Sequence, residues 1–150
     1  METVVLRFFN VYGPRRENST YSGAVTQFMI NLMENKPVTI TGDGTDQRDY
    51  VYVKDIAKGI HLGLKPGVSG EFNVATGVGT STTAMLKAIE KVVGKKAKVV
   101  HAPKRPGDTP YRVADITKAE VMLGYKPEYP LEKGLSEMRD YLYDVLGIGK

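Results

Sequence analysis

Residues 3–9 read Thr-Val-Val-Leu-Arg-Phe-Phe, and this short run decides the fold class. Nearly every side chain in it is apolar, and β-branched and aromatic residues dominate. Such a run is typical of a strand buried on both faces of a parallel sheet, because a half-exposed strand would alternate with polar residues. The sequence does not show which strands lie beside it.

The segments that follow alternate between strand and helix patterns. Strands are predicted at residues 38–40, 49–53, 71–75 and 98–101, and helices at residues 22–35, 56–64, 81–94, 115–124 and 131–146. Glycine, proline and Asx residues separate these segments, as expected of turns. The alternating order predicts an α/β fold.

Several residues have the chemistry of helix ends. Ser81 or Thr80 can cap one helix, which Gly94 ends as a C′ glycine. Asp115 is the candidate N-cap of the helix that ends at Gly124.

The helical pattern at residues 56–64 places Ile56, Ile60 and Leu64 on one face, which we expect to be buried. His61 lies on the same side, so we interpret it as a core histidine rather than a base.

Composition sets limits on the class of protein. The 150 residues suit one domain, and the 41% hydrophobic and 25% charged fractions are those of a globular chain. No apolar run approaches a membrane span, and the N-terminus shows no signal pattern, so we expect a cytoplasmic protein. Without cysteine, and with no second histidine at ligand spacing, no metal site is expected.

The net charge of +4 comes from scattered lysines and arginines rather than from basic runs. A few fixed cations beside a phosphate explain this balance as well as nucleic acid does. Nucleic-acid binding is disfavoured, because clustered basic residues with stacking aromatics are missing.

Four residues at strand ends or in loops suit a phosphorylated ligand: Asn10, Arg48, Arg105 and Asp108. Ligands bind there in open α/β sheets. Two arginines can grip a diphosphate, and an aspartate can accept hydrogen bonds from a ribose diol. Each residue also has an ordinary interpretation, as a turn former or a solvated charge. Composition and spacing alone therefore predict an α/β domain with a candidate anion site and nothing more specific.

Five segments, taken in order, carry a family resemblance. They are residues 6–15 (LRFFNVYGPR), 38–55 with VTITGDG and QRDYVYVKD, 71–77 (EFNVATG), 105–108 (RPGD) and 113–115 (VAD). This order resembles the C-terminal half of the extended short-chain dehydrogenase/reductase family, the NDP-sugar epimerases and dehydratases, which include UDP-glucose 4-epimerase. The resemblance covers nearly the whole chain. It implies a C-terminal substrate-binding domain with a remnant of the Rossmann parallel sheet.

The resemblance also implies roles for individual residues. Asn10, Arg48 and Arg105 would contact the diphosphate, and Asp108 the ribose hydroxyls. The remaining implied contacts are the backbone around Ala24, Val25, Thr39 and Thr41 with the base, the main chain at Phe9 and Tyr12 with the nicotinamide, and Arg112 with the sugar pocket. Thr41 stands where many relatives carry an aromatic residue, and Arg112 where the residue is often small, so the base and the sugar stay open.

Two features of the intact family are not found in the 150 residues: the glycine-rich turn that binds NAD and the catalytic Tyr-x-x-x-Lys pair. Tyr50 and Lys54 have that spacing, but they fall in the arginine strand and would not share one face. We therefore expect residues 1–150 to form the nucleotide-sugar-binding domain alone, without the N-terminal Rossmann half and without bound NAD. The chain would be a truncated protein, a fragment gene or half of a split enzyme.

Two functions remain open at this stage. The chain could be a half-enzyme, epimerase or dehydratase, inactive until a separate Rossmann chain completes it. It could instead be a stand-alone nucleotide-sugar-binding module without chemistry. In either case, the hydrophobic strand at residues 4–9 would lose neighbours if the N-terminal strands are missing, and we expect self-association through it.

Overall fold

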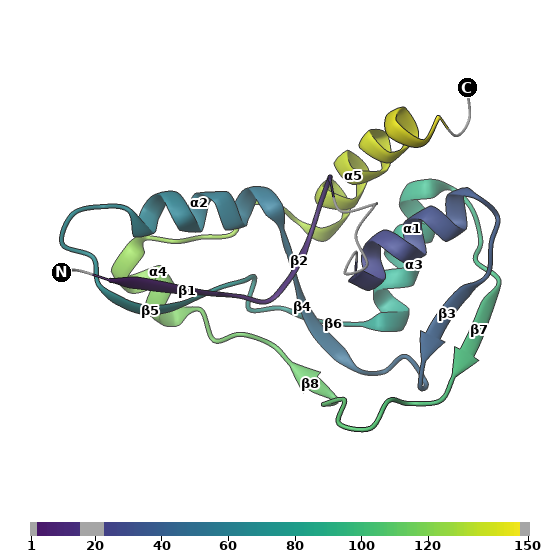
Figure 1. Ribbon diagram of the computed structural model, residues 1–150, viewed down its shortest axis with the longest axis horizontal. Helices are drawn as coiled ribbons and strands as arrows, with labels where there is room; N and C mark the ends of the chain where they lie inside the picture. The colour runs from purple at the N-terminus through teal and green to yellow at the C-terminus, as the bar shows by residue number, and fades with distance from the viewer. Residues whose placement is uncertain (1–2, 16–22, 148–150) are drawn as a thin grey trace.

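The computed structural model describes residues 3–15 and 23–147 and has a mixed α/β fold (Figure 1). Its elements in chain order are β1 (Val4–Phe8), β2 (Asn10–Tyr12), α1 (Gly23–Met33), β3 (Val38–Thr41), β4 (Gln47–Tyr52), α2 (Val53–Gly63), β5 (Gly70–Val74), β6 (Gly79–Ser81), α3 (Thr82–Val93), β7 (Val99–Ala102), β8 (Tyr111–Arg112), α4 (Thr117–Leu123) and α5 (Leu131–Leu146). The predicted α/β class is confirmed. Ser22, where the sequence places the start of the first helix, lies outside the described residues.

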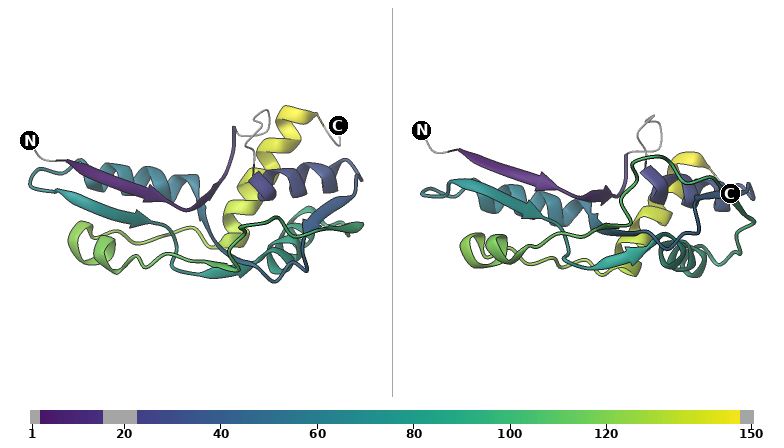
Figure 2. Two further views of the ribbon diagram at one scale, coloured as in Figure 1. Left: turned by 60° about the horizontal axis from the view of Figure 1, so that its bottom comes forward. Right: turned by 90° about the horizontal axis from the view of Figure 1, so that it is seen from below.

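The molecule is elongated, with separate hydrophobic clusters toward its two ends. Figure 1 shows β1, β5, α2 and α4 at one end and α1, α3, β3 and β7 at the other, and the views in Figure 2 agree. Phe72 and Val74 belong to the first cluster, and Met29, Met85 and Leu135 to the second. β4 runs between the two ends, so its residues can contact both.

β1 pairs with β5. The two strands are parallel, with Leu6 opposite Phe72, and α2 and α4 pack against the pair. α2 covers one face of β1, where Val4 and Leu6 lie beside Gly63. Val5, which points to the opposite face, is 43% exposed, and Phe8 at the end of the strand is 45% exposed. The prediction that this strand is buried on both faces is therefore wrong for the described residues, because none of their elements covers the second face.

β4 is the strand on which the other short strands meet. It pairs in parallel with β2 and β8 and antiparallel with β6. Arg48 lies opposite both Thr80 of β6 and Arg112 of β8. Since a strand has two edges, β6 and β8 must flank this part of β4 on opposite sides.

α2 forms as predicted, but it buries a different face. Ile56, Gly59 and Gly63 are buried, whereas Ile60 and Leu64 are 43% and 78% exposed. A Cβ atom at Gly59 would meet Val74 at 2.6 Å, so glycine lets the helix approach β5 closely. The predicted inner face was therefore wrong.

His61 is the second correction on α2, because its side chain is exposed rather than in the core. Because the buried face of α2 includes Gly59 and Gly63, both Ile60 and His61 lie on its exposed side.

The predicted helix ends are largely confirmed. Ser81 caps α3, where its hydroxyl accepts a hydrogen bond from the Ala84 amide at 3.1 Å. Gly94 ends the same helix in the left-handed conformation with φ 75°. Asp115 lies one residue before the N-cap position of α4, and its carboxylate accepts from the Thr117 amide at 2.9 Å.

α5 is the longest described helix and matches its predicted bounds. Leu135, Met138 and Leu142 are buried on one side, and Val145 is exposed. None of the helices within residues 3–15 and 23–147 combines the length and apolar character needed to cross a membrane.

Candidate functional site

A cavity of about 570 Å³ opens where β2, β4, β8 and the start of α1 come together. It is lined by Phe9, Asn10, Val11, Tyr12, Gly23, Ala24, Val25, Arg48, Tyr50, Thr82, Arg105 and Arg112. Eight of these residues were singled out from the sequence. Among the described residues, the charged side chains of the lining are three arginines and none is acidic, which suits an anionic ligand.

Strand pairing brings two of the arginines together from distant parts of the sequence. Arg48 and Arg112 are opposite each other on the parallel strands β4 and β8, so their side chains leave the same face. Arg105 reaches the cavity from the loop that precedes β8.

The Arg48 side chain is held in place and only 14% exposed. Its Nη1 donates to the carbonyl of Gln47 at 2.8 Å. Its Nη2 lies 3.7 Å from an Asp46 carboxylate oxygen, at the long end of an ion pair. Lys104 contacts the same carboxylate more closely, at 2.8 Å. Arg48 is therefore oriented by a backbone carbonyl and by a long ion pair, and its remaining N–H groups can still bind a ligand anion.

Asp49, next to Arg48, fixes the backbone around the cavity. It is fully buried, and its carboxylate accepts bonds from the Thr76 amide at 2.9 Å, the Thr76 hydroxyl at 2.6 Å and the Gly77 amide at 2.9 Å. The Ala114 amide donates to the same group at 3.3 Å. One carboxylate thus ties β4 to the loop after β5 and to the chain just beyond Arg112.

β2 supplies the opposite wall of the cavity. Asn10 is half-buried and pairs with Tyr50. The Tyr12 side chain is 2% exposed, and its hydroxyl donates to the Leu131 carbonyl at 3.2 Å. Burial raises the pKa of the Tyr12 phenol, so this group stays protonated and anchors the strand.

Sequence reasoning missed four lining residues: Val11, Gly23, Tyr50 and Thr82. Tyr50 comes from β4 and Thr82 from the start of α3. Burial raises the pKa of the Tyr50 phenol, and a hydrogen bond with Thr82 offsets part of this rise. The alternation of side chains along β4 could have identified Tyr50, because it lies two residues after Arg48 and on the same face.

Three predicted site residues lie outside the cavity lining: Thr39, Thr41 and Asp108. Thr39 and Thr41 belong to β3, which pairs with β7 and not with β4. Asp108 is half-buried in the loop before β8, where its amide donates to the Arg105 carbonyl at 3.2 Å.

Tyr50 and Lys54 do not form a catalytic pair in this fold. Tyr50 lines the cavity from β4, whereas Lys54 lies in the first turn of α2. The Lys54 ammonium donates to Glu137 at 2.7 Å, and this bond lowers the pKa of the Glu137 carboxyl. Within the described ranges, no group of three or more His, Asp or Glu side chains could hold a metal ion.

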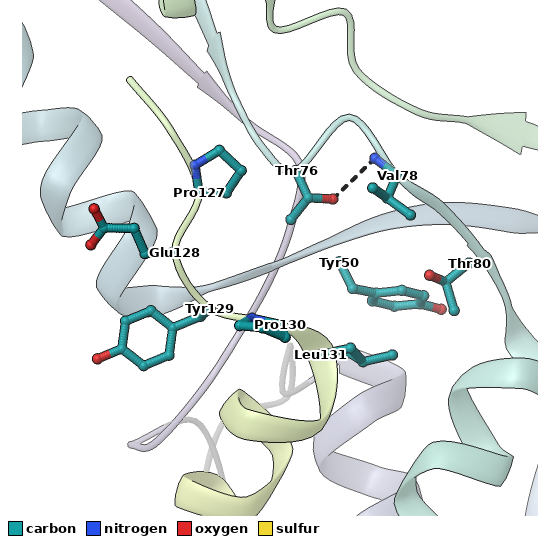
Figure 3. A pocket seen from close by; sticks show the side chains of 9 residues that line it. All are labelled: Tyr50, Thr76, Val78, Thr80, Pro127, Glu128, Tyr129, Pro130 and Leu131. Atoms are coloured by element: carbon teal, nitrogen blue, oxygen red, sulfur yellow. Dashed lines mark hydrogen bonds between the residues drawn. The ribbon is translucent and has the colours of Figure 1, made fainter. Parts of the chain in front are cut away.

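A second, smaller cavity of about 300 Å³ lies between the loop after β5 and the start of α5 (Figure 3). Its lining is Tyr50, Thr76, Val78, Thr80, Pro127, Glu128, Tyr129, Pro130 and Leu131. The Val78 amide donates a hydrogen bond to the Thr76 hydroxyl there, at 3.2 Å. Glu128 is the only charged residue in the part of this lining that the structure describes, and it is acidic, so this cavity does not suit a phosphate.

The fold matches the C-terminal domain of epimerase structures, and the arginine-lined cavity lies within this fold. The family model described as GDP-mannose 4,6 dehydratase matches residues 1–138. The chain therefore belongs to this family, and it is a partial, epimerase-like member of the short-chain dehydrogenase/reductases.

Several of the similar proteins are UDP-sugar epimerases. UDP-glucuronate 4-epimerase of Thermodesulfobacterium geofontis is 35% identical over 90% of this chain and 41% of its own length. A crystal structure of UDP-glucose 4-epimerase from Thermotoga maritima with UDP-glucose matches with a TM-score of 0.90 and 36% identity, over 95% of this chain and 46% of that one. The Thermus thermophilus enzyme in complex with NAD gives 0.86 and 35%, over 94% and 46%. The chain thus spans less than half the length of these relatives.

Proposed function

We propose that this chain is the nucleotide-sugar-binding half of an NAD-dependent NDP-sugar 4-epimerase-like enzyme, and that its ligand is a UDP-sugar. The observation that carries the proposal is the cavity lined by Arg48, Arg105 and Arg112, with no acidic side chain among the described residues of its wall. Charge-assisted bonds from guanidinium groups match a diphosphate in geometry and charge. The relatives that were solved with UDP-sugars support the choice of nucleotide.

Within this proposal the residues divide the work of binding. Arg48 and Arg105 neutralise the diphosphate, and Asn10 hydrogen-bonds it from β2. Ala24 and Val25 at the start of α1 border the base. The roles expected for Asp108 toward the ribose, and for Thr39 and Thr41 toward the base, stay part of the proposal, although these residues lie outside the cavity lining.

Catalysis by the 150 residues alone is not part of the proposed function. Phe9 and Tyr12 would lie near a nicotinamide, but contacts at that end leave the adenosine and pyrophosphate of NAD unheld. We therefore expect no NAD on the chain alone and no epimerisation by it. When NAD is bound in the family, it carries the hydride, and residues such as these bind and orient the sugar. The proposed location is the cytoplasm.

The direct test of the proposed function is titration calorimetry with UDP and with uridine. We expect UDP to bind at least about tenfold more tightly, because each charge-assisted bond to phosphate contributes about 1.5–3 kcal/mol. Titration with GDP tests the choice of base. If GDP bound more tightly than UDP, the proposed ligand would be a GDP-sugar instead of a UDP-sugar. Equal affinity for UDP and uridine would count against a diphosphate site.

We also propose that the chain associates with a second copy through β1, or with a separate Rossmann-half chain there. β1 pairs with β5 along one edge only within the described residues, and Val5 and Phe8 expose apolar surface beside the open edge. Such an edge is a template for pairing, with Arg7 as the sole charge on the strand. Burying this surface recovers about 25 cal/mol per Å² of apolar area.

A Phe8→Lys variant should shift the chain from dimer to monomer in sedimentation velocity. Val121→Lys is the matched control, since Val121 is 78% exposed on α4, away from the open edge. Leu6 is unsuitable for this purpose because it packs against α2. A monomeric wild type whose β1 amides resist hydrogen exchange would show that the edge needs no partner.

A further inference from the structure

The loop at residues 103–110 carries Arg105 and connects β7 with β8 (Figure 1). Its two ends are fixed, because β7 pairs with β3 and β8 pairs with β4. Arg105 itself is exposed, and within residues 3–15 and 23–147 its guanidinium has no carboxylate within ion-pair distance. The position of Arg105 therefore depends on what holds the loop between its ends.

Lys104, the residue before Arg105, provides such a contact. Its ammonium donates to one carboxylate oxygen of Asp46 at 2.8 Å, and the other oxygen of that carboxylate lies 3.7 Å from Nη2 of Arg48. The Asp46 side chain is 16% exposed. The Asp46 main-chain carbonyl accepts a bond from the Thr82 amide at 3.2 Å, which ties it to the start of α3. One carboxylate thus contacts both Arg48 and the neighbour of Arg105.

Asp46 and Lys104 lie outside the lining of the arginine-lined cavity. The hydrogen bond with Asp46 raises the pKa of the Lys104 ammonium, and the charges of Asp43 and Asp108 add to this rise. The ammonium is thus surrounded by carboxylates, which favours its contact with the protein over a contact with a ligand phosphate.

We propose that Asp46 is a positioning residue for the arginine-lined cavity, where it holds Arg48 and the loop of Arg105 together before the ligand binds. This inference rests on the proposed function, because the two guanidinium groups must share one diphosphate. A loop or side chain that becomes ordered only on binding subtracts the cost of its ordering from the affinity. The bond between Asp46 and Lys104 reduces this cost by ordering the loop in the free chain.

The alternative is that Asp46 is only a negative charge beside the site. A carboxylate near a phosphate-binding site repels the ligand, so its removal would then tighten UDP binding. Loss of a positioning contact has the opposite effect and weakens binding. The direction of the change therefore separates the two roles.

Calorimetry with UDP measures that direction. We expect Asp46→Asn, which keeps the shape of the side chain and removes its charge, to bind UDP about tenfold more weakly than wild type. The double variant Asp46→Asn/Lys104→Gln should bind no more weakly than Asp46→Asn alone, because both changes break the same contact. Lys104→Arg keeps the ion pair and should stay within about twofold of wild type.

Two controls exclude other causes of the loss. Asp140→Asn removes a carboxylate that pairs with Arg139 on α5, outside the cavity lining, and should stay within about twofold of wild-type affinity. The urea midpoint of Asp46→Asn should stay near that of wild type, because a partly exposed ion pair contributes little to stability.

NMR relaxation of the ¹⁵N-labelled free chain reports on the loop directly. The Arg105 amide should have a lower order parameter in Asp46→Asn than in wild type. An affinity of Asp46→Asn for UDP that equals or exceeds that of wild type, or an unchanged order parameter at Arg105, would overturn the positioning role while UDP binding by wild type stands. Absence of UDP binding by wild type would refute the proposed function, and this inference with it.

Discussion

Replacing Asp49 by alanine is expected to remove about 3–5 kcal/mol from the free energy of unfolding. The Asp49 carboxylate is fully buried and accepts four hydrogen bonds, three of them from backbone amides. Without it, the amides of Thr76, Gly77 and Ala114 are left without this acceptor. A buried donor that loses its acceptor is among the costliest changes a fold can undergo.

Urea denaturation of wild type and variant measures this loss. Asp115→Ala is the matched control, because Asp115 is exposed and its carboxylate accepts a bond from one amide, that of Thr117. The control should cost about 0.5–2 kcal/mol, as for other helix-end carboxylates. If Asp49→Ala costs no more than the control, Asp49 does not organise this part of the fold.

The second large effect concerns binding. The double variant Arg48→Ala/Arg105→Ala should bind UDP at least about a hundredfold more weakly than wild type, because two charge-assisted bonds of about 1.5–3 kcal/mol each are lost. Calorimetry at fixed ionic strength measures the change, since salt screens such interactions.

Lys87→Ala/Lys91→Ala is the control for charge. It removes the same two positive charges from exposed positions on α3, outside the arginine-lined cavity. UDP affinity in this control should stay within about twofold of wild type. An equal loss in both double variants would mean that net charge, and not the cavity, governs binding.

The sequence predicted the helices and strands well where a single local rule applies. α5 follows its apolar spacing from Leu131 to Leu146, and Ser81 and Gly94 bound α3 as their capping chemistry requires. The class of site also followed from the sequence, but through the resemblance of five ordered segments. Asn10, Arg48 and Arg105, taken one by one, have ordinary interpretations as turn or surface residues.

Tertiary contacts explain what the sequence did not predict. The hydrophobic pattern of α2 favoured Ile60 and Leu64 as core residues, yet Gly59 and Gly63 face the sheet. A Cβ atom at Gly59 would clash with Val74 at 2.6 Å, and one at Gly63 would be in tight contact with Val4 at 3.3 Å. Small residues carry little weight in a hydrophobic pattern, so such a face is easily missed.

The site depends on long-range pairing in the same way. Arg112 adjoins Arg48 only because the two-residue strand β8 pairs with β4. No local pattern in two residues predicts a strand, and none gives its register. Similarly, β1 lacks alternation in the sequence, and its exposed face became visible only once its neighbours were known.

The most direct test of the central claim, that the arginine-lined cavity binds a nucleoside diphosphate, is a titration of the ¹⁵N-labelled chain with UDP followed by NMR chemical shifts. Saturable shifts are predicted for the amides of Asn10, Ala24, Arg48, Thr82 and Arg112, which border the cavity. Saturable shifts confined to Thr76, Val78 and Tyr129 beside the smaller cavity, or no saturable shifts at millimolar UDP, would contradict it.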